Sequence, residues 1–164
     1  GLGAGHNLPY YDPVRVQSVF GIDPCQESWE LAESRAKALG VPLEFLCGTA
    51  ENMPLPDSCF DSVLMTYSLC TIPNPVAALS EVRRTLKPGG NLVFCEHGQA
   101  PDNKVARWQC RMNPLWKVLF GGCNLNRSII ALIEEAGFTL DSVEEMYLPG
   151  TPRILGFNTW GKAF

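Results

Sequence analysis

The sequence predicts an α/β fold: a doubly wound, mostly parallel sheet with an antiparallel hairpin near its C-terminus. Apolar, β-branched runs alternate with segments of helical periodicity along the chain. Several of these runs are almost continuously apolar, which is typical of strands that a parallel sheet buries on both faces. The last two runs flank the turn-forming stretch LPGTP. The chain of 164 residues has the length of one domain.

The first third of the chain predicts a strand, a helix and a second strand. The first strand runs from Val16 to Asp23. The helix covers residues 27–39 and ends at Gly40, because apolar residues recur on one face at Trp29, Ala32, Ala36 and Leu39. The second strand is the short run from Leu43 to Cys47.

The middle of the chain predicts another strand, helix and strand. Residues 61–67 form the strand. Asn74 is expected to cap the next helix and Pro75 fits its first turn. The helical face consists of Val76, Leu79, Val82 and Leu86, and Pro88-Gly89-Gly90 ends the helix. Residues 91–97 follow as a buried strand.

The last third predicts a helical excursion or lid, a helix and the hairpin. Residues 100–120 are mixed in character and carry Trp108 and Trp116, so this segment is the expected lid. Asn126 is expected to cap a helix that ends at Gly137. The hairpin strands cover residues 139–147 and 153–160.

Composition and charge exclude several classes of function. Hydrophobic residues make up 46% of the chain and charged residues 18%, as in globular enzymes and unlike disordered chains. The net charge of −4 lacks the basic footprint of a nucleic-acid-binding protein, so no nucleic acid partner is expected. Residues 62–80 carry no charge, but Pro73, Asn74 and Pro75 interrupt them, so no membrane segment is predicted within the chain.

The seven cysteines are interpreted as reduced thiols that pack as small hydrophobic side chains. Their number is odd and no C-x-x-C pair occurs, so neither a disulfide framework nor a metal site is predicted. This points to a cytoplasmic protein. No signal peptide is recognisable, but the chain has no initiator Met, so an anchor or targeting segment upstream of Gly1 is left open.

Glycines at alternate positions open the chain, in the stretch GLGAGH. Glycines between a strand and a helix let backbone N–H groups approach a ligand closely. An acidic residue at the end of the following strand suits the two hydroxyls of a ribose, and Asp23 lies at about the expected distance from Gly1. The sequence therefore favours a cofactor that contains a nucleoside.

The glycine pattern alone leaves the cofactor open. The nicotinamide fingerprint requires G-x-G-x-x-G, whereas here the third glycine is Gly5 and position six is His6. A nicotinamide-dependent oxidoreductase is thus the alternative enzyme class. A tight turn without a ligand, in a non-catalytic protein that keeps the fold, is the other alternative.

Four longer stretches carry a resemblance to a known family. They are GLGAGHNLPYY, VFGIDP, CGTAENMPLPDSCFDSVLMTYSLCTIPNP and EVRRTLKPGGNLVFCEH. Together they resemble the class I S-adenosylmethionine-dependent methyltransferases, which have a Rossmann-like fold, in the small-molecule branch with the ubiquinone/menaquinone C-methyltransferases. The last stretch, with GGCNLNRSIIALIEEAGF, is similar to the methyltransferase-like thiol S-methyltransferases and their bacterial relatives. The resemblance covers the chain from Gly1 to about Lys162.

The resemblance implies S-adenosylmethionine as cofactor and a set of residues that bind it. The glycines line its methionine and ribose part, Asp23 binds the ribose hydroxyls, and Pro24 packs near the adenine. Relatives often carry an acidic residue where this chain has Thr49, so the hydrogen bond to the adenine edge is in question. The full expected set is Gly1, Gly3, Gly5, Asn7, Asp23, Pro24, Thr49, Ala50, Glu51, Tyr67, Ser68 and Leu69.

The expected reaction is methyl transfer to a small-molecule acceptor, such as a thiol, a phenol or a quinone. A thiol or phenol must lose a proton, which a nearby base assists. His97, after the predicted strand 91–97, is the first candidate, followed by Glu96 and then His6. The segment from Trp108 to Trp116 and the hairpin turn are expected to shape the acceptor pocket.

The resemblance also implies that residues 1–164 are a single methyltransferase domain without its N-terminal helix and first strand. In the family, that strand lies between those that end here at Asp23 and Tyr67. We therefore expect unpaired strand edges beside Val19 and Leu64. We also expect a marginally stable chain that binds the cofactor weakly on its own, and its activity on its own is left open.

Overall fold

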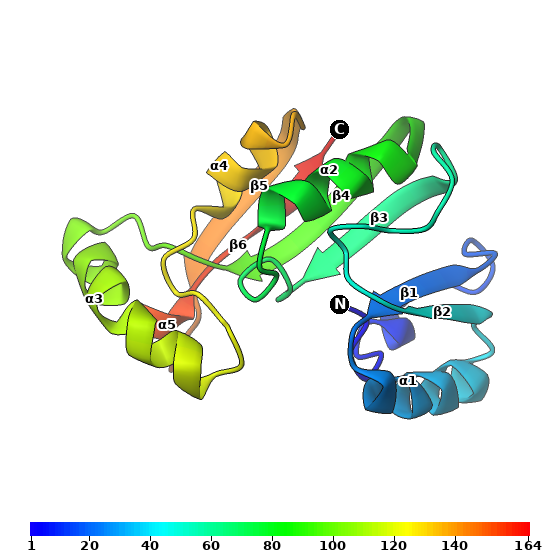
Figure 1. The fold of residues 1–164 in the computed structure, drawn as a ribbon, viewed down its shortest axis with the longest axis horizontal. Coiled ribbons are helices and arrows are strands. Elements are labelled where there is room, and N and C mark those ends of the chain that lie inside the picture. The colour runs from blue at the N-terminus through cyan, green and yellow to red at the C-terminus, as the bar shows by residue number, and fades with distance from the viewer. The chain divides into compact units, whose positions relative to one another are not determined.

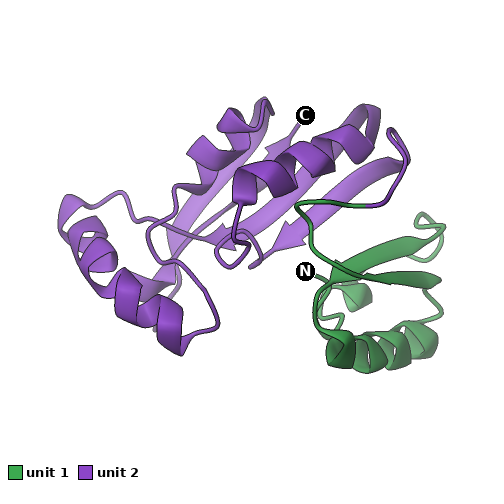
Figure 2. Cartoon of the chain, in the orientation of Figure 1, with its two compact units in different colours: residues 1–53 green, residues 54–164 purple.

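The computed structural model describes residues 1–164 and divides them into two units (Figure 2). The N-terminal unit comprises Gly1–Met53 and the C-terminal unit comprises Pro54–Phe164. Each unit has its own sheet, with two strands in the first and four in the second. Strands and helices alternate in both, so the predicted α/β class is confirmed.

The N-terminal unit places one helix against a pair of parallel strands. The glycine turn leads into the short 3-10 helix η1 (Leu8–Tyr10), followed by β1 (Val19–Asp23), α1 (Gln26–Leu39) and β2 (Leu43–Cys47). β1 and β2 pair in parallel, with Val19 opposite Leu43 and Asp23 opposite Cys47. Leu8, Ala36 and Val41 form the buried core of this unit.

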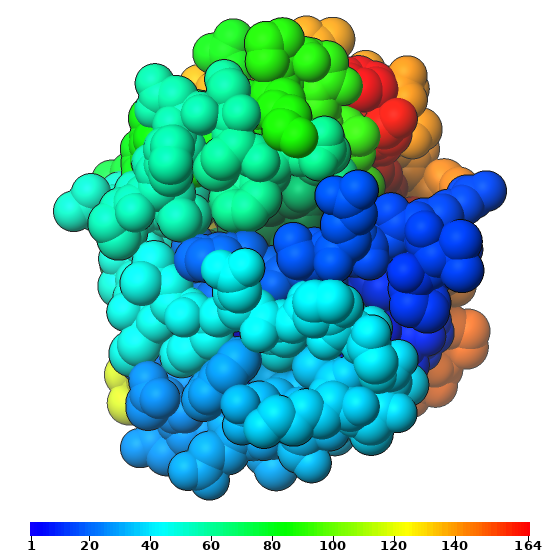
Figure 3. Space-filling view, turned by 90° about the vertical axis from the view of Figure 1, so that its right-hand side faces the viewer, coloured from blue at the N-terminus to red at the C-terminus, as the bar shows by residue number.

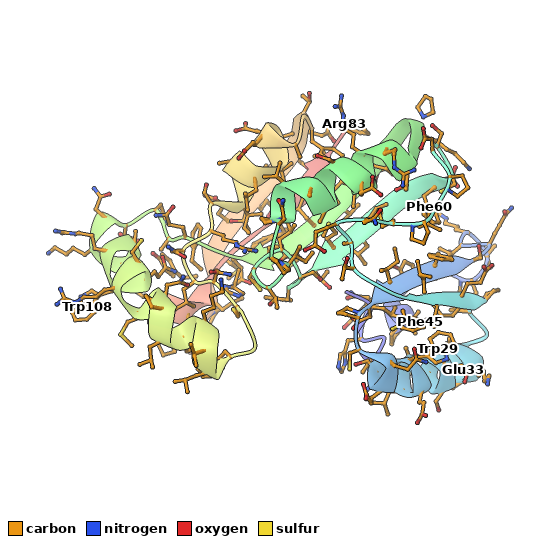
Figure 4. All side chains as sticks on the ribbon, viewed as in Figure 1. Trp29, Glu33, Phe45, Phe60, Arg83 and Trp108 are labelled. Carbon is orange, nitrogen blue, oxygen red and sulfur yellow. The ribbon has the colours of Figure 1, made fainter.

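The outer part of α1 is anchored by an aromatic contact. Trp29 of α1 and Phe45 of β2 stack with ring centroids 4.8 Å apart, and their side chains lie side by side in Figure 4. In the space-filling view, α1 and β2 contribute the blue-to-cyan surface of this unit (Figure 3). Offset stacking of this kind adds about 0.5–1.5 kcal/mol to the burial of the rings.

The C-terminal unit is a four-stranded sheet with helices attached (Figure 1). Its elements, in chain order, are β3 (Phe60–Thr66), α2 (Pro75–Thr85), β4 (Leu86–His97), α3 (Asn103–Leu119), α4 (Ile129–Glu135), β5 (Leu140–Tyr147), α5 (Arg153–Gly156) and β6 (Phe157–Ala163). The strand order is β3-β4-β6-β5. β3 and β4 are parallel, whereas β6 is antiparallel to both of its neighbours, which confirms the predicted hairpin.

One face of this sheet is covered by α2 and α4, which lie next to each other (Figure 1). Alternate residues of β4 are buried, namely Leu92, Phe94 and Glu96. Leu79 of α2 and Ile133 of α4 are fully buried as well. The period of two in β4 thus supplies the core with two apolar side chains and one carboxyl group.

Several predicted helix boundaries are confirmed. The Asn74 side chain caps α2 by accepting a hydrogen bond from the backbone N–H of Ala77 at 3.1 Å. Gly40 ends α1 and Gly137 follows α4, both with positive φ. Residues 100–120 do contain a helix, α3.

Several boundaries differ from the prediction, and β1, for example, begins at Val19 rather than at Val16. Leu86 belongs to β4 rather than to the preceding helix, which ends at Thr85. Ser128, not Asn126, is the N-cap of α4, because a hydrogen bond from the backbone N–H of Gln99 to the carbonyl of Arg127 keeps the chain extended up to that point. Residues 153–156 form a helical turn before β6, since the backbone N–H of Gly156 bonds back to the carbonyl of Pro152.

β1 and β3 each have a single hydrogen-bonded neighbour, β2 and β4 respectively. Val19 in β1 and Leu64 in β3 therefore each lie on a strand with one edge that no other strand pairs, as the sequence predicts. The expectation about an element upstream of Gly1 stays a prediction. None of the helices combines the length and the apolar character that a bilayer span requires.

Candidate functional site

The glycine turn at the start of the chain is shaped by two residues with positive φ, Gly3 (52°) and Gly5 (73°). A Cβ on Gly5 would lie 2.6 Å from Leu8 Cδ1 and 3.1 Å from the Cα of Ala32 in α1, so packing alone accounts for this glycine. A Cβ on Gly3 would meet no atom within 4 Å. The backbone at Gly3 therefore borders open space, as expected where a ligand approaches a main chain.

Asp23, at the end of β1, fastens this turn. Its Oδ2 accepts a hydrogen bond from the backbone N–H of Gly3 at 2.8 Å, and its Oδ1 accepts one from that of Cys25 at 2.9 Å. Only 8% of Asp23 is exposed. A carboxylate has about four acceptor positions, so two remain for hydroxyl groups. The geometry fits the predicted ribose contact and adds a structural role, since Asp23 also fixes the glycine turn.

The remaining predicted residues of this unit follow the ends of the two strands. Pro24 comes directly after β1, and the carbonyl of Asp23 accepts a hydrogen bond from the backbone N–H of Gly48 at 3.2 Å. Thr49, Ala50 and Glu51 come next in the chain, at the same edge of the sheet. The N-terminal unit thus brings together the glycine turn, Asp23 and the loop after β2.

Arg35 is a residue near this turn that the sequence analysis missed. Its Nη1 donates to the carbonyl of Ala4 at 2.9 Å and lies 3.0 Å from His6 Nδ1. Arg35 thereby fixes the turn from the side of α1. A single arginine within an amphipathic helix gives no signal in the sequence that would separate it from a solvent-exposed charge. His6, the third candidate base, is held in this contact.

In the C-terminal unit, the predicted residues Tyr67, Ser68 and Leu69 form a tight turn after β3. Tyr67 has a φ of 50°, which is uncommon for a residue other than glycine. Glu96 Oε1 accepts hydrogen bonds from the backbone N–H groups of Ser68 at 2.8 Å and Leu69 at 3.1 Å. Nη1 of Arg127, which the sequence analysis missed, donates to the carbonyls of Leu69 and Ile72. Glu96 and Arg127 thus fix this turn together.

Glu96 itself is completely buried, and its Oε2 has no hydrogen-bond partner. Burial raises the pKa of this carboxyl to about 7, although hydrogen bonds from the backbone N–H groups of Ser68, Leu69 and Cys70 act in the opposite direction. An unpaired buried carboxyl oxygen is unusual and points to a functional position. The two predicted candidates on β4 therefore differ, because Glu96 is sealed in the core whereas His97 is partly exposed.

Tyr67 reaches across to β6. Its hydroxyl donates to Oδ1 of Asn158 at 2.8 Å, and the Asn158 Nδ2 group donates to the carbonyl of Gly156 at 3.0 Å. The Tyr67 and His97 rings are stacked with centroids 6.3 Å apart. Burial raises the pKa of Tyr67, so this phenol is a hydrogen-bond donor at neutral pH. Asn158 is a third residue that the sequence analysis missed.

His97 also belongs to a cluster with two cysteines. His97 Nε2 lies 3.1 Å from Cys123 Sγ, and the Trp116 indole N–H donates to the same sulfur at 3.4 Å. The ligand atoms of Cys70, His97 and Cys123 all lie within 4.8 Å of one another. Burial lowers the pKa of His97 and raises that of Cys70 to about 12, so these two groups are neutral at pH 7. The three residues come from separate segments, so spacing rules for cysteine pairs do not detect them.

The expected acceptor region is largely α3. Trp116 stacks on Phe120 with ring centroids 3.7 Å apart and faces Cys123 through its indole N–H. Trp108 is 59% exposed and projects from the helix in Figure 4. Gln109 anchors α3 by accepting from the Ala100 N–H and donating to the carbonyls of Gly98 and Ile154. That this region shapes an acceptor pocket stays a prediction.

Comparisons with known proteins agree with this arrangement. Residues 1–94 match the family described as methyltransferase domain. The chain is 36% identical over 164 residues to thiol S-methyltransferase TMT1B of Rattus norvegicus, a match that covers 95% of this chain and 67% of that protein. These matches favour a methyltransferase over the nicotinamide oxidoreductase that the glycine pattern left open.

Solved structures of other proteins also have a fold similar to that of this chain. The YcgJ protein of Bacillus subtilis is 28% identical, with a TM-score of 0.72 over 90% of this chain and 64% of that chain. The BH2331 protein of Bacillus halodurans C-125 is 19% identical, with a TM-score of 0.77 over 99% of this chain and 88% of that chain, and shares the fold. The chain belongs to the class I S-adenosylmethionine-dependent methyltransferases, and its cofactor is S-adenosylmethionine.

Proposed function

We propose that the protein transfers the methyl group of S-adenosylmethionine to a small apolar thiol. The thiol is proposed because the relative from Rattus norvegicus, 36% identical over 95% of the chain, is named a thiol S-methyltransferase. The structural observation that carries the proposal is the pair of hydrogen bonds by which Asp23 holds the glycine turn while the backbone at Gly3 stays open.

Each unit, taken by itself, contains residues proposed to bind the cofactor. In the N-terminal unit, the open backbone at Gly3 and the free acceptor positions of Asp23 support contacts to the methionine and ribose parts. In the C-terminal unit, the turn fixed by Glu96 and Arg127 supports a role beside the methionine. The proposed set is Gly1, Gly3, Gly5, Asn7, Asp23, Pro24, Thr49, Ala50, Glu51, Tyr67, Ser68 and Leu69.

Methyl transfer from S-adenosylmethionine requires few chemical steps from the side chains of the protein. S-adenosylmethionine, when bound, supplies a methyl group that is already activated as a sulfonium. The protein has to align the acceptor with that methyl group and to exclude water. A free cysteine thiol has a pKa near 8.5 and a simple alkyl thiol is a weaker acid still, so the acceptor is protonated at pH 7 and a base accelerates the reaction.

His97 is the proposed proton acceptor. Its imidazole is neutral at pH 7 because burial lowers its pKa, and its side chain is partly exposed at the end of β4. Glu96 is proposed to act as a positioning residue. It is sealed from solvent, and its hydrogen bonds hold Ser68 and Leu69 in place.

The experiment incubates the protein with methyl-labelled S-adenosylmethionine and one of three acceptors: an alkyl thiol, a phenol or a reduced quinone. We expect labelled thioether and S-adenosylhomocysteine in equal amounts with the thiol, and little product with the other two. Preferred methylation of the phenol or quinone would overturn the thiol assignment. His97→Gln is expected to lower kcat by about 10²–10⁴-fold for the thiol, the range of a general base, and an unchanged kcat would overturn the role of His97.

A further inference from the structure

We propose that Cys70, His97 and Cys123 form a binding site for a single thiophilic divalent cation of the zinc type. The site lies within the C-terminal unit, where the turn after β3, the end of β4 and the loop before α4 meet. Two thiolates and one imidazole are a donor set that zinc takes in proteins. The inference does not depend on the identity of the methyl acceptor.

The distances are close to those of a metal site. The three ligand atoms lie within 4.8 Å of one another, and His97 Nε2 is already 3.1 Å from Cys123 Sγ. Around a tetrahedral zinc ion with bonds of about 2.0–2.3 Å, ligand atoms are about 3.3–3.8 Å apart. A closure of about 1 Å, within reach of small side-chain rotations, would therefore complete the site.

The backbone holds the two cysteines in fixed relation. The carbonyl of Cys70 accepts hydrogen bonds from the backbone N–H of Asn124 at 2.8 Å and from its Nδ2 group at 2.9 Å. Oδ1 of Asn113 in α3 accepts from the backbone N–H of Leu125 at 2.7 Å. His97 is fixed by the pairing of β4 with β6. The three segments are thus held together without a metal ion, which reduces the ordering that binding would require.

The surroundings suit thiolates that bind a cation. The Trp116 N–H points at Cys123 Sγ, as the hydrogen-bond donors around metal-bound thiolates do. Binding releases the two thiol protons of Cys70 and Cys123, so that two thiolates and one divalent cation form a neutral group in a largely buried place. Cys123 and His97 are partly exposed, which gives the ion an entry path.

Three protein ligands leave the fourth position of a tetrahedral ion open for water or another small donor. The ion would also engage the His97 imidazole, which is assigned above to proton removal. The free and the metal-loaded protein therefore differ in whether His97 can accept a proton. Binding measurements test the cation site separately from methyl transfer. A result that contradicts one of these two assignments therefore does not contradict the other.

The experiment titrates the reduced, metal-free protein with Zn²⁺ in competition with a chromophoric chelator, and then with Co²⁺ as a spectroscopic probe. The variants are Cys123→Ser, Cys70→Ser and His97→Gln. Cys59→Ser is the matched control, because Cys59 is also partly buried but lies outside the cluster. Circular dichroism checks that each variant is folded, which matters most for Cys70, only 3% exposed.

We expect one Zn²⁺ per chain and a Co²⁺ complex with sulfur-to-metal charge-transfer absorption. Cys123→Ser and His97→Gln should each weaken Zn²⁺ binding by more than about 100-fold, since even residues behind the ligands contribute about 10–100-fold, while Cys59→Ser should bind like the wild type. A protein that takes up no Zn²⁺, a Cys123→Ser variant with unchanged affinity, or a Co²⁺ spectrum without charge transfer would overturn the proposal. A Cys70–Cys123 disulfide in a protein that binds no Zn²⁺ when reduced would also overturn it, and would identify a redox pair instead.

Discussion

Asp23 combines two roles in one carboxylate, since it holds Gly3 and Cys25 and keeps acceptor positions for a ribose. Asp23→Ala should raise the dissociation constant for S-adenosylmethionine by about 5–150-fold, which corresponds to about 1–3 kcal/mol for a lost charged hydrogen bond. Asp23→Asn is the matched variant. Because it keeps one oxygen acceptor, its affinity for S-adenosylmethionine should fall less than that of Asp23→Ala. Calorimetry measures both, and an affinity that Asp23→Ala leaves unchanged would contradict the ribose assignment.

Alanine substitutions at Gly3 and Gly40 distinguish the effect of backbone strain from the effect of ligand contact. Both have positive φ and a Cβ on either would meet nothing within 4 Å, but Gly40 ends α1 while Gly3 is in the turn. Each substitution by alanine should lower the free energy of unfolding by about 1–2 kcal/mol. Only Gly3→Ala should also weaken cofactor binding, because its methyl group would fill the open space. Equal loss of affinity in both variants would show that strain alone is responsible.

Substitutions of Glu96 likewise distinguish a role in positioning the turn after β3 from a role in proton transfer. Glu96→Gln keeps an oxygen that accepts from Ser68 and Leu69, so we expect a folded enzyme with nearly unchanged kcat. Glu96→Ala removes the acceptor of the buried backbone N–H groups that bond to this carboxyl and should destabilise the protein by about 1–3 kcal/mol for each of them. Denaturant unfolding and measurements of kcat distinguish the two roles. A Glu96→Gln variant that folds normally but has a strongly reduced kcat would identify Glu96 as the proton acceptor.

At the scale of elements, the sequence predicts helices and strands well wherever local chemistry determines them. Asn74 and Pro75 set the start of α2, and the period of two in β4 sets its buried face. The helical turn α5, which closes through a local hydrogen bond from Gly156 to Pro152, was not predicted, and the start of α4 was predicted wrongly because a tertiary hydrogen bond of Gln99 overrides local preference there. The cluster of Cys70, His97 and Cys123 was missed for the same reason, since only the fold brings these segments together.

Packing of α4 against the sheet gives a prediction at this scale. Ile133 is fully buried, whereas Val118 on α3 is 80% exposed. Ile133→Ala should lower the free energy of unfolding by about 2–5 kcal/mol, the cost of a cavity in a core, while Val118→Ala should change it by less than about 0.5 kcal/mol. Urea unfolding measures both. Similar losses in the two variants would mean that α4 does not seal the core as described.

For the whole molecule, the class of fold and the nucleoside part of the cofactor follow from residues close together in the sequence. The glycine turn and Asp23 are brought together by one strand, so their spacing alone identifies them. Arg127 and Asn158 support the turn after β3 from distant parts of the chain, and no local pattern marks them. The acceptor depends on such long-range contacts, which is why the sequence leaves a thiol, a phenol and a quinone open.

The central claim is that the chain recognises S-adenosylmethionine through its glycine turn. Ligand-observed NMR detects weak binding directly and tight binding through competition with a weaker ligand, and therefore tests this claim most directly. We expect S-adenosylhomocysteine to bind the protein, to be displaced by S-adenosylmethionine and to bind far less to Asp23→Ala, while NADH gives no signal. Binding of NADH in place of S-adenosylhomocysteine, or of neither, would contradict the account.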